Sequence, residues 1–147
     1  MRVFTLLSVC IFGALSLSAQ APQRYQKAAQ AALQAQMSQE GHDCLDQRTT
    51  AEGNDCIAKS ATMSQHDFGV FYDNLLSLVG DHESANRQKL SEAQDQWELY
   101  RNKTCEAIDY LYRGGSIQPS AVTRCRIELL RSRMRDLDTI YHTVLHN

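Results

Sequence analysis

Large apolar residues recur at spacings of three and four in three long stretches of the chain, with no sustained alternation of apolar and polar positions. This spacing places them on one face of an α-helix, whereas a half-buried strand would show a period of two. The first helix is predicted to begin after Thr49, where Thr49 and Glu52 have the form of a capping box, and to end at Gly80. Its apolar stripe is Phe68, Phe71, Leu75 and Leu78.

The two later stretches repeat the pattern. One helix is predicted from about Glu83 to Tyr112, ending at Gly114-Gly115 because glycine readily adopts the left-handed conformation that terminates helices. The next should start at Pro119 or Ser120. With short connections, the pattern predicts an all-α fold, a small antiparallel bundle of about three long helices. The expected seams are Leu90, Ala93, Trp97, Tyr100, Thr104, Ala107 and Leu111, then Ile127, Leu130, Met134, Leu137, Tyr141 and Val144.

Residues 1–19 have the composition of a secretory signal peptide: one basic residue, Arg2, a mostly apolar stretch, 3–17, and a small-residue exit. The apolar stretch is short for a membrane span, which needs ~20 apolar residues, so a cleaved peptide is favoured over an anchor. We expect cleavage near Ala19, because a cut two residues later would leave rigid Pro22 immediately after it. The mature chain is therefore predicted to be periplasmic or secreted, without a stable membrane anchor.

Residues 20–43 are rich in glutamine and alanine. Helix propensity is high there, but Tyr25, Leu33 and Met37 are the only large apolar side chains. We therefore expect a flexible or helical arm, more solvated than packed, in front of a helical domain that spans 44–147.

The cysteine count supports export. Cleavage removes Cys10 and leaves four cysteines, an even number that indicates two disulfides in an oxidising compartment. Four cysteines allow three pairings, and the sequence alone does not select one. We favour Cys44–Cys56 and Cys105–Cys125, because each pair is close in sequence and brackets a turn-like stretch. The spacings are too wide for zinc knuckles.

Charge and motifs narrow the functional classes. The 15 basic and 17 acidic residues give a net charge of −2, which becomes −3 when Arg2 is removed, and this argues against nucleic-acid binding. The sequence has no GxSxG, no HExxH and no phosphate-binding glycine loop, so we expect neither enzymatic activity nor a cofactor. His142 and His146 share a helix face but have no evident third ligand, so no metal site is predicted.

Arginines are the densest charges in the chain. Arg101 comes one residue after the seam position Tyr100 and four after Trp97, which places it at the edge of the core. We expect carbonyls of the turn around Gly114 to anchor its guanidinium there. The arginines of the third helix should pair in part with acids on the preceding helix and be solvated otherwise. They are Arg124, Arg126, Arg131, Arg133 and Arg135.

Taken in order, the motifs of the second half resemble the LprI-type lysozyme-inhibitor family of bacterial envelope proteins. The resemblance spans roughly Cys44 to Tyr141; Phe68-Gly69 departs from the expected Leu-Asn pair, and the arm lies outside it. It implies an exported helical domain with both local disulfides and a protein partner, a lysozyme or another peptidoglycan hydrolase. The residues that carry it are Gln94, Trp97, Tyr100, Arg101, Cys105, Gly114, Gly115 and Cys125, with Cys44, Thr50, Cys56 and the 67–76 segment upstream.

An inhibitor of this kind must block a catalytic cleft with a rigid loop or helix end. The loop from Arg113 to Ser120 is the candidate, because a bridge between Cys105 and Cys125 would pre-organise it and lower the entropic cost of binding. Two alternatives to a lysozyme inhibitor remain, an envelope interaction or structural module without a lysozyme target, and an immunity protein against a wall hydrolase. The candidate contact residues are Arg113, Ser116, Ile117 and Gln118.

Overall fold

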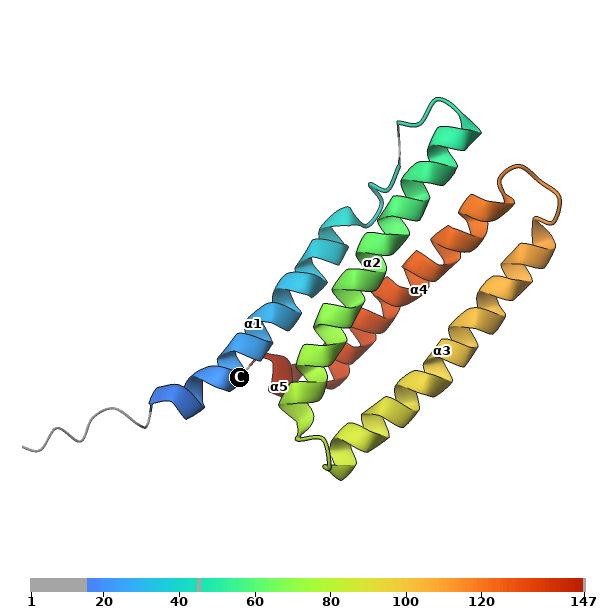
Figure 1. The fold of residues 1–147 in the computed structure, drawn as a ribbon. Helices are drawn as coiled ribbons and strands as arrows, with labels where there is room; N and C mark the ends of the chain where they lie inside the picture. The colour runs from blue at the N-terminus through green and yellow to red at the C-terminus, as the bar shows by residue number, and fades with distance from the viewer. Residues whose placement is uncertain (1–15, 45, 147) are drawn as a thin grey trace, which may run out of the picture.

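The protein is all-helical over the residues that its computed structural model describes, 16–44 and 46–146 (Figure 1). The expectation of about three long helices is wrong in number, since these residues form four long helices and one short one. The signal-peptide prediction falls almost wholly on residues outside the described part. The helices are α1 (Ser16–Gln39), α2 (Thr50–Val79), α3 (Ala85–Leu111), α4 (Gln118–Ile140) and α5 (His142–His146).

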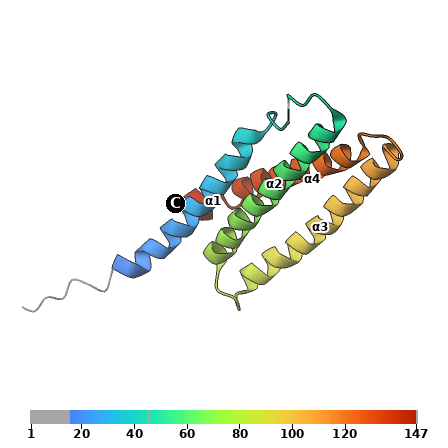
Figure 2. The same ribbon diagram turned by 45° about the horizontal axis from the view of Figure 1, so that its top comes forward.

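Consecutive long helices run antiparallel, and α2 and α4, which therefore run in the same direction, pack against each other at the centre of the molecule. Helix α1 packs mainly on α2 and α3 mainly on α4, so that α1 and α3 make no contact over the described residues. The α1–α2 and α3–α4 connections lie at the same end of the molecule, and the α2–α3 turn lies at the other (Figures 1 and 2). The short α5 contacts α1, α2 and α4 near that second end.

The glutamine- and alanine-rich arm is not a solvated leader. Its helix buries Ala29, Ala32 and Gln36 against the rest of the fold. Two further glutamines bond to the backbone near the C-terminus: Gln26 Nε2 donates to the Val144 carbonyl at 3.0 Å and Gln30 Nε2 to the Leu145 carbonyl at 2.5 Å. Tertiary packing and polar contacts therefore hold a helix that has few large apolar residues.

The ends of α2 follow the sequence signals. The hydroxyl of Thr49 accepts from the Glu52 backbone N–H at 3.2 Å, while the Glu52 carboxylate accepts from the Thr49 N–H at 3.1 Å. This reciprocal pair is the predicted capping box. At the other end Gly80 has φ +156°, a conformation that side chains disfavour, and an added Cβ would lie 2.1 Å from Ser84 Oγ. The chain therefore turns sharply into the next cap, where Ser84 Oγ accepts from the Arg87 N–H.

The seam predicted for α3 is wrong at Ala93, which is exposed, and again beyond Trp97. Tyr100 is 57% exposed and Leu111 is 72% exposed, while the fully buried positions are Leu90, Gln94 and Cys105. The predicted positions repeat every 3.5 residues on average, so they drift around a straight helix with 3.6 residues per turn. The true inward face therefore passes through Arg101 instead of Tyr100.

The last predicted helix is also shorter than expected. Helix α4 ends at Ile140, and the chain turns at Tyr141 before α5. The Tyr141 N–H still bonds to the Leu137 carbonyl at 2.9 Å, and the Tyr141 carbonyl accepts from Val144. The turn brings Leu145, which is fully buried, into the core beside α1.

Candidate functional site

Two local disulfides fasten the end of the molecule where the α1–α2 and α3–α4 connections lie. Cys44 bonds to Cys56 and Cys105 to Cys125, with Cα–Cα distances of 5.9 and 5.7 Å. The favoured pairing is thus the one that the structure has. The first bridge ties the connection after α1 to the start of α2, and the second ties α3 to α4 on either side of the predicted partner-binding loop.

That loop is a closed turn held by its own hydrogen bonds. Gly114 takes φ +78°, which favours glycine, and the Gly115 N–H bonds to the Tyr112 carbonyl at 3.0 Å. Gln118 links both sides: its Oε1 accepts from the Gly114 N–H at 2.9 Å and its Nε2 donates to Asp109 Oδ1 at 2.7 Å. Gln118 therefore holds the turn together, whereas Ser116 lies exposed on it.

Apolar side chains gather around the turn instead of being buried. The guanidinium of Arg113 lies 3.8 Å from the centroid of the Tyr110 ring, close enough for a cation–π contact. The exposed residues around the turn form a surface that we call the tip surface, at the end of the bundle that carries the disulfides. It consists of Tyr110, Leu111, Tyr112, Arg113 and Ile117.

The tryptophan motif of α3 lies in the packing between α3 and its neighbours. The Trp97 ring stacks on Phe68 with centroids 5.9 Å apart, and the guanidiniums of Arg101 and Arg133 lie 5.2 and 5.7 Å from its centroid. Gln94 is buried, and its Oε1 accepts from Arg133 Nε at 3.2 Å. These residues are brought together as scaffold; Tyr100, the other member of the motif, is not among them.

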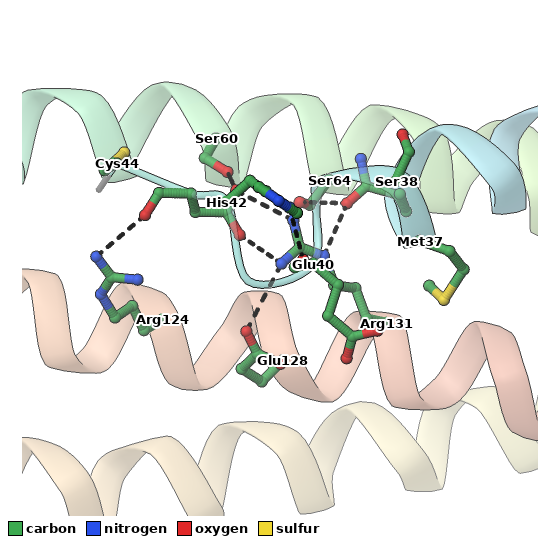
Figure 3. A network of polar contacts seen from close by, with 12 residues as sticks. Met37, Ser38, Glu40, His42, Cys44, Ser60, Ser64, Arg124, Glu128 and Arg131 are labelled. Atoms are coloured by element: carbon green, nitrogen blue, oxygen red, sulfur yellow. Dashed lines mark hydrogen bonds and ion pairs between the residues drawn. The ribbon is translucent and has the colours of Figure 1, made fainter. Parts of the chain in front are cut away.

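The structure also contains a buried ionic network that the sequence reasoning did not identify. Arg131 is completely buried and donates to both carboxylate oxygens of Asp43, at 2.5 and 3.1 Å. Gln36 accepts from Arg131 Nε at 3.4 Å and from Ser64 Oγ at 2.7 Å, and Ser60 donates to Asp43. Figure 3 shows this network between α2 and α4, with the connection that follows α1 running through it.

The network controls the ionisation of Asp43. Burial alone would raise the pKa of this carboxyl, but the hydrogen bonds from Arg131 and Ser60 and the positive charges of Arg131 and Arg124 lower it below the ordinary value of 3.8. The ion pair therefore joins the segment beside Cys44 to the centre of α4 as a charged contact. One sequence signal was present, because Arg131 lies between Leu130 and Met134, at the edge of the apolar stripe of α4.

The other arginine predictions are corrected in detail. Arg135 pairs with Glu40 at 2.7 Å and Arg124 donates to the Asp43 carbonyl at 3.4 Å, so both reach the α1–α2 connection instead of acids on the preceding helix. Arg101 lies over Trp97, and its Nε has no hydrogen-bond partner in the described residues, so carbonyls of the Gly114 turn do not anchor it.

The two C-terminal histidines belong to the contact between α4, α5 and α1. Their rings stack with centroids 4.5 Å apart, and His146 Nε2 lies 2.7 Å from Asp138 Oδ1. Among residues 16–44 and 46–146, no group of three side chains is arranged to hold a metal ion. In the same part of the chain, every helix is too short or too polar to cross a membrane.

These features define a disulfide-stapled all-α domain whose interior includes a buried ion pair and whose stapled end exposes an apolar turn. The chain belongs to the lysozyme inhibitor LprI family, whose model matches residues 42–137. It is also similar to an uncharacterized protein of Rhizobium meliloti (strain 1021), with 40% identity over 50 residues. That alignment covers 34% of this chain and 36% of the relative, so the chain spans about a third of the relative's length. No solved structure matches the chain.

Proposed function

We propose that the protein is exported and inhibits a lysozyme or a related peptidoglycan-cleaving enzyme by binding to it. Membership of the lysozyme inhibitor LprI family is the observation that carries this proposal. The two disulfides support export, because such bonds persist in oxidising compartments. The match covers the bundle from the first disulfide to the end of the α4 stripe, which is the part that presents the tip surface.

The tip surface supplies the contact with the enzyme. Tyrosine and arginine are the residue types that dominate binding energy in protein interfaces, and the tip offers Tyr110, Tyr112 and Arg113 beside Leu111 and Ile117. The Cys105–Cys125 bridge and the bonds of Gln118 pre-organise the turn, so little conformational entropy is lost on binding.

The shape and charge of the tip fit a catalytic cleft. A lysozyme holds catalytic acids inside a cleft, so a narrow protrusion that carries one cation complements it. Arg113 provides that cation, and its stacking on Tyr110 limits the conformations that it adopts before binding. Occupation of the cleft by the tip would exclude the polysaccharide without any chemical step by the inhibitor.

Cell-wall clearing by a panel of lysozymes, with and without the oxidised protein, tests the activity. Leu111→Ser should weaken inhibition at least tenfold, since it removes an apolar side chain, 72% exposed, from the centre of the tip. Ile140→Ser is the matched control, because Ile140 is 68% exposed at the far end of α4 and should leave inhibition unchanged.

The outcomes separate the alternatives. Full clearing by every lysozyme at excess inhibitor would overturn the proposal and favour an envelope interaction or structural module. Protection from one wall hydrolase encoded beside this gene, without an effect on lysozymes, would favour an immunity protein. Equal loss of inhibition in Leu111→Ser and Ile140→Ser would be compatible with inhibition by the protein but would rule out the tip surface as the contact site.

A further inference from the structure

A groove of about 540 Å³ lies between α2, α3 and α4, away from the tip surface. It forms because α2 and α3 contact each other little, while both pack on α4. The volume lies within the range of about 300–1,000 Å³ that is typical of sites for small molecules. Its polar lining consists of Thr62, Gln65, Arg101, Asn102 and Arg126.

The positive charge of Arg101 is not neutralised by the protein. Its guanidinium packs over Trp97, its Nε is buried, and over the described residues that atom has no hydrogen-bond partner and the side chain no ion pair. Glu98, one turn earlier, accepts a hydrogen bond from Gln94 at 3.4 Å instead. Because a buried donor without an acceptor is costly and Arg101 lines the groove, this arginine favours a ligand that brings an acceptor.

The second arginine of the groove reinforces this electrostatic preference. Arg126 is exposed and makes no ion pair within the described part of the chain. The amides of Gln65 and Asn102 and the hydroxyl of Thr62 add donors, and the lining contains no carboxylate. Two guanidiniums with neutral donors form an environment that favours an anion.

The apolar part of the lining narrows the kind of anion. Ile127 and Leu130 of α4 and Ala61 of α2 line the same groove. A free inorganic ion would leave these side chains without a partner, whereas a carboxylate on a short aliphatic group would contact both parts. We propose that this groove binds a carboxylate that is attached to a short apolar group, with Arg101 and Arg126 as its charge partners.

This site is independent of the proposed inhibition, because it shares no residue with the tip surface. The carboxylate has two sources, a free organic acid or the C-terminus of a peptide. Isovalerate represents the first and N-acetyl-glycyl-leucine the second, with isovaleramide and the leucine amide as uncharged controls. Titration of the oxidised full chain, followed by the backbone amide signals of the groove, measures each affinity.

Both acids should give saturable shifts at Gln65, Asn102 and Arg126 with a Kd of about 1 mM or tighter, and both amides should not. If the peptide acid binds more tightly than isovalerate, the source of the carboxylate is a chain terminus. If isovalerate binds as tightly or more tightly, the source is a free organic acid. Absence of saturation for both acids, or equal binding of acids and amides, would overturn the site.

Charge-removing variants complete the test. Arg126→Gln should weaken binding about tenfold, because hydrogen bonds to charged groups are worth at least one such step, and an exposed residue should leave the fold intact. Arg101→Gln should weaken it further. Arg48→Gln removes the same charge from an exposed position outside the groove and should change nothing. An unchanged Kd in Arg126→Gln would refute the role of the arginine pair.

Discussion

Replacing Arg131 with methionine removes the buried cation and keeps most of the side-chain volume. In the folded protein the Asp43 carboxylate, whose side chain is 8% exposed, would then retain the hydrogen bond from Ser60 and the more distant positive charge of Arg124, but no ion pair. Gln36 would also lose a donor to its Oε1. The variant therefore leaves an almost buried negative charge without its counter-ion.

The expected loss is large relative to the stability of a domain. Removing one partner of a buried ion pair costs about 3–5 kcal/mol, out of a total of roughly 5–15 kcal/mol for a typical domain. Arg135→Met is the matched control, because Arg135 lies one turn later on α4 and its ion pair with Glu40 is 44% and 41% exposed. An exposed pair of this kind contributes about 0–1 kcal/mol.

Urea denaturation of the oxidised proteins at neutral pH, followed by far-UV circular dichroism, gives both free energies of unfolding. The double variant Arg131→Met/Asp43→Asn should recover part of the loss, since it removes the uncompensated charge. A loss for Arg131→Met no greater than that for Arg135→Met would refute the reasoning.

The same ion pair predicts the pH dependence of stability. The pKa of Asp43 is lowered in the folded state, so the unfolded chain binds the proton more readily. The contribution of Asp43 is therefore complete above its ordinary pKa of 3.8 and is lost as the pH falls below that value through the folded pKa. Asp43→Asn should remove this part of the acid dependence; an unchanged acid limb of the stability curve would contradict it.

Three further predictions concern single positions. Thr49→Ala should lower the free energy of unfolding, measured by urea denaturation, by about 1 kcal/mol, since it removes the capping acceptor of α2. Thr50→Ala, the neighbouring control, should change this free energy little. Gly80→Ala should cost more than about 1 kcal/mol, because φ is +156° and the new Cβ would meet the capping serine of α3, while Gly69→Ala has open space within a helix and should be neutral or stabilising. Burial raises the pKa of Tyr72 to about 12, so ultraviolet titration should show one late tyrosine phase that Tyr72→Phe abolishes; titration of all six tyrosines together would refute it.

Local signals predicted the helix ends better than the contacts between helices. The capping box at Thr49 and the stop at Gly80 depend on residues within one turn of each other, and both appear in the structure as expected. The inward face of α3 depends on which helix it packs against. Arg101 faces inward in place of Tyr100 because α3 packs on α4 and the Arg101 guanidinium lies over the Trp97 ring.

Long-range polar contacts were beyond the reach of periodicity. The Arg131–Asp43 pair joins residues 88 positions apart, and nothing local to either position specifies the other. The packing of α1 was missed for a related reason, since its buried residues are two alanines and a glutamine, whose small or polar side chains give no apolar stripe. Within the candidate site, the disulfides and the turn at Gly114 could be predicted from the sequence. The exposed apolar residues around the turn could not, because the sequence pattern does not distinguish them from apolar residues of the core.

Because both disulfides lie at one end of the bundle, the covalent cross-links are unevenly distributed along its length. Over the described residues, the opposite end, with the α2–α3 turn and α5, is held by noncovalent contacts. Backbone opening should therefore start there, and amide hydrogens near that turn should exchange faster than those beside the bridges. An opened molecule would still keep α1 attached to α2 and α3 attached to α4, so that the tip could retain its shape while the remainder of the bundle fluctuates.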